Sequence, residues 1–186
     1  MSASDDHETW HDEAVDEIRA TQLELGTTPS GGFSTVKDRL DAHEDHCQVK
    51  RSGGGTQTIN HGSITTIAFD AEDFDPNGWH STSSNNERVL PDVAGWYRVT
   101  LVLSWTADTD LTRVFGIVTK NGGTIDTDDR PYTVPTGVGV QNRVVTTLVS
   151  MNGTTDYFTA TCYQENTSTG TNVMTPVMLV EFVRPA

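Results

Sequence analysis

The order of hydrophobic and polar residues divides the chain into two parts that follow different periods. Within residues 6–25, Trp10, Ala14 and Ile18 recur at steps of four, and Leu25 follows seven residues after Ile18. This spacing places one apolar stripe on an acidic helix, which a glycine ends. A helix with so narrow an apolar stripe is only marginally stable alone in water, so we expect it to pack against another component.

A second amphipathic segment follows a loop that contains glycine and proline. Thr35 is its predicted N-cap, with Asp38 at the capping-box spacing. Its apolar or small positions alternate steps of three and four, and they are Phe33, Val36, Leu40, His43 and Cys47. This is the heptad pattern of a short coiled coil. So short a seam cannot hold chains together alone and would need a neighbouring oligomeric domain. The alternative is a single amphipathic helix that packs on the body of its own chain.

The pattern changes to period two after residues 51–55, where a run of glycines predicts a flexible hinge. We expect strands over 63–69, 95–105, 111–120, 138–151, 156–165 and 172–184. In the clearest of these, one face carries Tyr97, Val99, Leu101, Leu103 and Trp105. Asn-Gly pairs at 121–122 and 152–153 predict hairpin turns, and 71–91 is expected to be a connecting loop.

Strands at regular spacing with no helix between them are typical of an antiparallel β-sandwich or jelly roll. The expected organisation is a helical anchor and stalk over 1–50, a hinge over 51–55 and a mainly β jelly-roll head over 56–186. A head of this length can bury its own core. Apolar residues left on an outer face could be covered by packing three copies around an axis.

Two segments carry resemblances to known families. Residues 25–42, LGTTPSGGFSTVKDRLDA, resemble an N-terminal module of structural proteins of tailed viruses. The body resembles the trimeric jelly roll of tumour necrosis factor and complement globular heads, in the version found on virion fibres. The residues that carry this second resemblance are Ile67-Ala68-Phe69-Asp70, Phe74-Asp75, Val93-Ala94-Gly95-Trp96-Tyr97-Arg98-Val99, Asn121-Gly122 and Leu179-Val180-Glu181-Phe182.

The resemblance implies a homotrimeric protein on the surface of a virion, on its capsid or its tail. The stalk seam would then be a trimer stalk, and the residues that anchor the chain to other virion proteins would be Trp10, Ala14, Ile18 and Leu25. The head would decorate the shell or bind a host-surface receptor or glycan. The alternative function is a carbohydrate-binding β-sandwich module of a cellular adhesin or enzyme.

Aromatic residues in polar loops are the candidate ligand contacts of the head. They are Trp79, His80 and Tyr132. Exposed aromatic side chains often anchor partners, but these residues could equally pin their loops to the body.

Composition narrows the function further. The 186 residues include 26 acidic side chains against 12 Lys and Arg, a formal net charge of −14. A surface this negative repels phosphate backbones, which disfavours nucleic-acid binding. No apolar run approaches the roughly 20 residues that a bilayer-spanning helix needs, so we expect no membrane insertion. A strongly acidic chain with few lysines also suits concentrated salt, which makes a halophilic host a hypothesis.

Several short motifs were weighed as chemical sites. His7-Glu8-Thr9-Trp10-His11 matches the HExxH zinc motif, but it lies on a thin helix with no sheet beside it. The acidic runs 70–73 and 126–129 offer oxygen ligands for Ca²⁺ without EF-hand spacing, so solvated loops are favoured. His43 and His46, near Cys47, could hold a metal on a threefold axis, but a polar layer of the stalk is the favoured interpretation.

No motif for a catalytic nucleophile, phosphate-binding loop or dinucleotide site is present, and two cysteines cannot make a disulfide scaffold. We therefore expect no enzyme activity and no cofactor, and we expect Cys162 to be a buried small hydrophobe. Two tripeptides, Asn152-Gly153-Thr154 and Asn166-Thr167-Ser168, match the N-glycosylation sequon.

Overall fold

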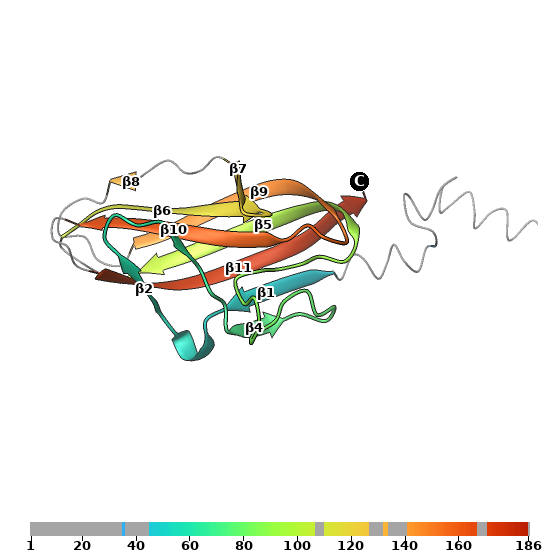
Figure 1. The fold of residues 1–186 in the computed structure, drawn as a ribbon, viewed down its shortest axis with the longest axis horizontal. Helices are drawn as coiled ribbons and strands as arrows, with labels where there is room; N and C mark the ends of the chain where they lie inside the picture. Colours follow the sequence, from blue (N-terminus) through green and yellow to red (C-terminus); the bar gives the residue numbers. More distant parts are fainter. Residues whose placement is uncertain are drawn as a thin grey trace, which may run out of the picture. The chain divides into compact units, whose positions relative to one another are not determined.

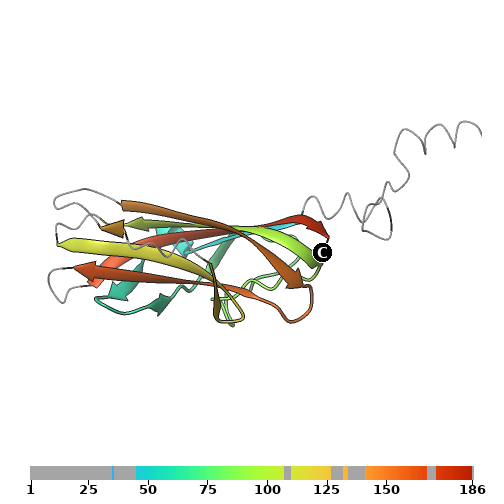
Figure 2. The same cartoon turned by 90° about the horizontal axis from the view of Figure 1, so that it is seen from above.

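The computed structural model describes Thr35 and residues 45–106, 110–126, 132–133, 141–166 and 171–185. Its strands form two antiparallel sheets (Figure 1). Sheet A contains β1 (His46–Lys50), β2 (Gln57–Asn60), β4 (Ala71–Phe74), β5 (Ala94–Trp105), β9 (Gln141–Asn152) and β11 (Thr171–Pro185). Sheet B contains β3 (Thr65–Thr66), β6 (Leu111–Lys120), β7 (Gly123–Asp126), β8 (Tyr132–Thr133) and β10 (Phe158–Asn166). The strands of both sheets run along the same long direction (Figure 2).

The order of the strands identifies the sandwich as a jelly roll. Sheet A runs β4-β1-β11-β5-β9, and sheet B runs β3-β10-β6-β7. Without β2, β4 and β8, eight strands remain, and they can be numbered 1 to 8 in chain order. Their spatial order is then 1-8-3-6 in sheet A and 2-7-4-5 in sheet B. This is the interleaved pattern of two Greek keys. The expected fold class, a mainly β antiparallel jelly-roll sandwich, is confirmed for the body.

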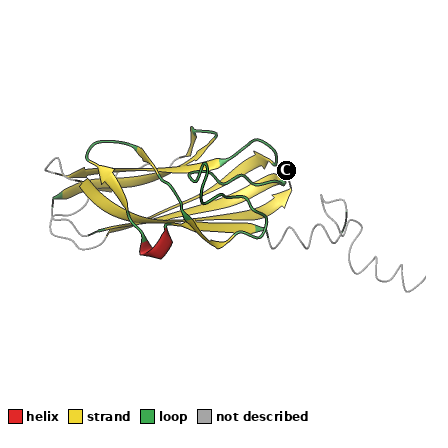
Figure 3. Cartoon of the chain, turned by 60° about the horizontal axis from the view of Figure 1, so that its bottom comes forward, coloured by secondary structure: helices red, strands yellow, loops and turns green. Residues whose placement is uncertain are grey.

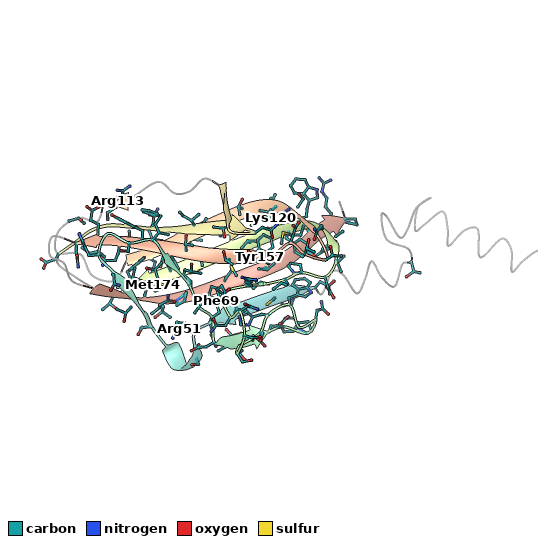
Figure 4. The ribbon with its side chains drawn as sticks, viewed as in Figure 1. Arg51, Phe69, Arg113, Lys120, Tyr157 and Met174 are labelled. Carbon is teal, nitrogen blue, oxygen red and sulfur yellow. The ribbon has the colours of Figure 1, made fainter. Side chains whose placement is uncertain are left out.

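The core forms because alternate residues of each strand point between the sheets. On β5, five side chains are fully buried, namely Tyr97, Val99, Leu101, Leu103 and Trp105. They meet Phe158, Ala160 and Cys162 from β10, which are also fully buried. Phe69 and Met174, labelled in Figure 4, belong to the same core. The period-two prediction for these strands is therefore confirmed.

Gly116 of β6 lets the two sheets approach closely. A Cβ atom at this position would lie 2.5 Å from Cδ1 of Leu103 and 3.3 Å from Cδ2 of Leu101. The glycine thus leaves room for two large leucines of the facing sheet, and the core stays closely packed there.

The sandwich begins earlier than the sequence suggested. His46–Lys50 is strand β1, which pairs with β11 and β4, and Cys47 is fully buried in the core. The prediction that Cys47 belongs to a helical stalk seam is wrong, because the alternating burial of β1 follows period two. The other seam positions, Phe33, Val36, Leu40 and His43, lie outside the described residues.

The glycine run is a tight turn within sheet A. Ser52–Gly54 forms the 3₁₀ helix η1, which is red in Figure 3, and it joins β1 to β2. Gly53 and Gly54 take positive φ angles of 58° and 68°, a conformation that favours glycine. Both flanking strands pair with β11, at residues 177–181 and 171–174. The hinge predicted over 51–55 is therefore part of the sandwich rather than a link to it.

The remaining differences concern short or irregular segments. The strand expected over 63–69 is reduced to the two residues of β3, and the loop expected over 71–91 starts with β4. The helix expected before residue 26 lies outside the described residues. Within the described part of the chain, the structure contains no helix long and apolar enough to cross a membrane.

Candidate functional site

The outer surface of sheet A carries apolar side chains from three neighbouring strands. Val144 of β9, Val102 of β5 and Val177 of β11 are direct cross-strand partners, so they form one row across the sheet. Val144 is 54% exposed, while Val102 and Val177 are partly exposed. Cross-strand neighbours on one face contact each other, so the row is a continuous apolar strip.

Two leucines extend this strip along the strands. Leu148 lies four residues beyond Val144 on β9 and is 56% exposed. Leu179 lies two residues beyond Val177 on β11 and is partly exposed. We refer to the five residues together as the apolar face, which consists of Val102, Val144, Leu148, Val177 and Leu179. A cluster of exposed aliphatic side chains on a sheet is typical of an interaction surface.

Polar residues at the apolar face satisfy one another. The hydroxyls of Thr100 and Thr146 lie 3.3 Å apart between the valine row and Leu148. Arg98, the cross-strand partner of Leu148, forms an ion pair with Glu181 at 3.6 Å. Because these groups are already paired, a partner that covers them pays a smaller desolvation free energy than it would for unpaired charges.

Strand β9 lies at the edge of sheet A and has few of the sequence features that usually protect an edge, although Lys120 donates a hydrogen bond to its Ser150 carbonyl oxygen at 2.6 Å. It has 12 residues and pairs with β5 in continuous register, with no β-bulge. Its sequence contains no proline, and its one charged residue is Arg143. Among the described residues β9 is the last strand of sheet A, so one side of its backbone has no strand partner within that sheet. Natural edges of this length are commonly blunted by charge, proline or a bulge, or else covered by another element.

Two pairs of apolar residues in the sequence of β9 are a signal for the apolar face. Val144-Val145 and Leu148-Val149 are pairs of consecutive apolar residues in β9. In a strand, one member of each pair must point outward. Val145 and Val149 are 3% and 6% exposed and point into the core, which leaves Val144 and Leu148 on the outside.

The candidate ligand contacts Trp79 and His80 are buried, at 1% and 8% exposure. The Trp79 indole packs edge-on against Tyr97, with ring centroids 5.6 Å apart, and its Nε1 donates to Oδ1 of Asp92 at 2.7 Å. The carboxylate of Asp75 accepts the backbone N–H groups of both Trp79 and His80, each at 2.9 Å.

His80 is held by its ring as well as by its backbone. Its Nδ1 lies 2.8 Å from Oε1 of Glu72, and its Nε2 lies 3.2 Å from the carbonyl oxygen of Asn86. These contacts pin the 75–92 loop to the body. The expectation that Trp79 and His80 contact a ligand is therefore corrected, and the alternative, that they fix the loop, describes the structure. The third candidate, Tyr132, lies in β8, and its side chain is not among those that the structure describes.

The two cysteines are buried and protonated rather than poised for chemistry. Burial raises the pKa of the Cys162 thiol to about 12. Burial, with the carboxylates of Asp75 and Glu72 nearby, raises the pKa of Cys47 further. Because the thiolate is the nucleophilic form, neither residue is suited to nucleophilic catalysis near neutral pH.

The acidic run at 70–73 is neutralised locally. Asp73 pairs with Lys50 and accepts a hydrogen bond from Gln48, and these contacts hold its pKa below the usual range. Asp70 accepts the backbone N–H of Ser52 at 2.6 Å, which lowers its pKa, with Arg51 adding a smaller effect.

Within the described ranges, no three His, Cys, Asp or Glu side chains gather to hold a metal ion. The second acidic run begins at Asp126, and residues 127–129 lie outside those ranges, as do the HExxH segment and the anchor residues Trp10, Ala14, Ile18 and Leu25. His46 is stacked on Phe74 with ring centroids 3.9 Å apart, and Cys47 is buried in the core, while His43 lies outside the described residues.

Comparison with known proteins gives structural matches without sequence relatives. No family model matches the chain, and no curated protein sequence matches it. Among solved structures, the PRD1 vertex protein P5 aligns with a TM-score of 0.52 and 11% identity, over 74% of this chain and 73% of that one. The globular domain of the zebrafish complement 1qA protein aligns at 0.47 and 12% identity, covering 76% and 98%. Eiger TNF from S. frugiperda aligns at 0.46 and 11% identity, covering 76% and 94%.

Proposed function

We propose that this chain is a non-enzymatic structural protein of a virion, whose jelly-roll head assembles as a homotrimer. Residues before the head would anchor it to other proteins of the capsid or tail. The head would decorate the particle or carry host-surface contacts on its loops. The proposal joins the resemblance of residues 25–42 to viral structural proteins with the surface properties of sheet A.

The observation that carries the proposal is the apolar face beside the edge strand β9. Val144 and Leu148 are more than half exposed, and their strand ends sheet A without proline or bulge. A single copy would leave these aliphatic side chains in water, beside a strand edge that has no strand partner among the described residues. A partner that covers this region removes both costs at once.

Further copies of the same chain are the occupants that fit best. The apolar face is aliphatic, and the charges that border it, Arg98 and Glu181, already pair within one chain. A surface of this kind does not need a partner of opposite charge, so another part of a second copy of the chain can cover it. In a closed ring of three copies, no apolar face is left over.

The virion location is supported by one structural likeness. The PRD1 vertex protein P5 shares the fold at a TM-score of 0.52. Fold alone does not determine function, so this likeness only favours one of the uses that a jelly roll allows. The acidic composition of the chain is consistent with a halophilic host.

The assembly is tested by a double substitution on the apolar face, Val144→Lys with Leu148→Lys, followed by sedimentation velocity of the full chain. We expect trimers for the wild type and monomers for the variant, because two ammonium groups cannot be buried there without partners. The matched control is Ile64→Lys. Ile64 is 64% exposed but lies outside the strands, so this variant should stay trimeric. Trimers in the double variant would refute the assignment of the interface.

The alternative, a carbohydrate-binding module, has less support. Exposed aromatic rings commonly stack on sugars, and Trp79 is one of the aromatic residues that the sequence offered as a possible ligand contact. That side chain is 1% exposed and packed against Tyr97, so it offers no stacking surface.

A further inference from the structure

The turn between β9 and β10 contains one of the two N-glycosylation sequons, Asn152-Gly153-Thr154. We propose that Asn152 is a glycan acceptor site of the folded protein and that the second sequon, at Asn166, is not. The modification would attach a sugar to Nδ2 of Asn152. This inference does not depend on the proposed assembly or on the virion location.

The acceptor asparagine is exposed and already shaped by its turn. Asn152 and Thr154 both lie on the exposed part of the turn. Oδ1 of Asn152 accepts the backbone N–H groups of Thr154, Thr155 and Asp156 at 3.0, 2.9 and 3.0 Å. These bonds fix the carboxamide next to Thr154, the residue whose hydroxyl completes the sequon.

The glycine between them is required by the backbone. Gly153 has a φ angle of 70°, and a Cβ there would lie 2.4 Å from the backbone nitrogen of Ala94. The turn therefore rejects larger residues at the middle position. It also rejects proline, which fixes φ at a negative value and blocks the sequon.

The existing hydrogen bonds are compatible with a bound glycan. Nδ2 of Asn152 donates to Oγ1 of Thr155 at 2.8 Å and carries a second hydrogen. Glycosylation replaces one hydrogen of Nδ2, so the other can still donate to Thr155, and Oδ1 can still accept. The glycan can thus be added without dismantling the turn.

Asn166 provides the contrast within the same chain. It is 5% exposed and belongs to the inward-facing set of β10. Its Oδ1 lies 2.9 Å from Nδ1 of His61, and the same ring nitrogen lies 3.2 Å from the backbone nitrogen of Asn166. A sugar on this side chain would have to enter the sandwich, so the folded chain cannot accept it.

The reaction requires an activated sugar, which we take to be an oligosaccharide linked through pyrophosphate to a lipid. Nδ2 of Asn152 forms a bond to the anomeric carbon, while the bond from that carbon to the phosphate oxygen breaks. The lipid pyrophosphate leaves with the bonding electron pair, and the carboxamide nitrogen releases one proton. No oxidant or reductant is needed.

The test incubates the purified, folded full chain with an oligosaccharyltransferase specific for Asn-x-Ser/Thr and its lipid-linked donor, and reads intact mass. We expect one glycan per chain, located at Asn152 by peptide mapping. Thr154→Val should abolish it while leaving the carboxamide in place, and Thr154→Ser should retain it. Asn166→Gln should leave occupancy unchanged.

Because Asn152 also builds the turn, Thr154→Val decides the outcome more cleanly than Asn152→Gln does. The donor and enzyme are first validated on an unfolded acceptor peptide. An unmodified wild-type chain under those validated conditions would overturn the proposal. A glycan on Asn166 of the folded chain, or one that survives Thr154→Val, would do the same.

Discussion

Nζ of Lys120 lies 2.7 Å from Oδ2 of Asp156, and this ion pair joins the turn after β6 to the turn between β9 and β10. Oδ1 of the same carboxylate accepts a hydrogen bond from Nδ2 of Asn121 at 2.7 Å. Oδ2 accepts a second one from the backbone N–H of Asn152 at 2.9 Å. Figure 4 labels Lys120 and, next in sequence to Asp156, Tyr157. The carboxylate of Asp156 therefore holds together two turns, each of which contains an Asn-Gly pair.

Asp156→Asn should destabilise the protein at neutral pH and much less in acid. The hydrogen bond from Lys120, followed by that from Asn121, lowers the pKa of Asp156 in the folded state. A lowered pKa means that the ionised form stabilises the fold. That contribution is complete above the ordinary aspartate pKa of about 3.9 and is lost as the pH falls through the folded pKa. We expect a loss of about 1–3 kcal/mol at pH 7, measured by urea unfolding.

The control for this experiment is Glu87→Gln. The carboxylate of Glu87 pairs with the adjacent Arg88 at the surface, at 3.0 Å. Its removal should change the free energy of unfolding by less than about 1 kcal/mol. A difference between wild type and Asp156→Asn that stayed constant down to strongly acidic pH would contradict the role given to the carboxylate.

Gly95→Ala should be strongly destabilising, although the residue lies in a regular strand. A Cβ at this position would lie 2.6 Å from the carbonyl oxygen of Arg184 and 2.4 Å from Cε2 of Phe182. The backbone of β11 would have to move, at a cost of about 1–3 kcal/mol. Thermal unfolding measures the effect. The control is Gly123→Ala, where a Cβ would lie 3.5 Å from the Lys120 carbonyl oxygen, an ordinary contact distance. This variant should be close to neutral, and equal losses of stability in the two variants would contradict the explanation.

Trp79→Phe should loosen the 75–92 loop without disrupting the sandwich. The substitution keeps an aromatic ring against Tyr97 but removes the donor to Asp92, which costs about 1–3 kcal/mol. We expect faster trypsin cleavage after Arg88, which lies in this loop. Trp96→Phe is the comparison, since Trp96 lies on the outer side of β5 and is partly exposed. Unchanged cleavage at Arg88 in Trp79→Phe would show that the indole N–H does not hold the loop.

Deletion of residues 1–25 tests the anchor. The proposal predicts soluble heads that still trimerise but no longer join particles, because Trp10, Ala14, Ile18 and Leu25 are removed while β1 to β11 remain. The measurement is co-sedimentation of the truncated chain with particles assembled in its presence. Normal incorporation would contradict the anchoring role of this segment.

The strands of the core were predictable because their periodicity was strong. In β5 every second residue from Tyr97 to Trp105 is apolar and buried, a pattern that fits a strand with one face on a core. The prediction failed where a short segment fits two periods. Cys47 continues the three-four spacing of the preceding residues, yet with Val49 it also starts a period of two, and pairing with β11 decides in favour of the strand.

Burial of the 75–92 loop could not be predicted in the same way. The segment is polar and aperiodic, and Trp79 is fixed by Asp75 and Asp92, whose hydrogen bonds depend on the loop's folded path. The apolar face was hidden for a different reason. Alternation identifies two faces of β9, but only the exposed fractions of Val144 and Leu148 in the folded sandwich show which outward-facing residues stay accessible.

The molecular mass of the full chain in solution, determined by sedimentation equilibrium over a dilution series, tests the central claim most directly. The account predicts a species of three chains that persists on dilution, since the apolar face and the edge β9 are covered only in the assembly. A mass of one chain at every concentration would contradict it, because the exposed side chains of Val144 and Leu148 would then be stable in water without a partner.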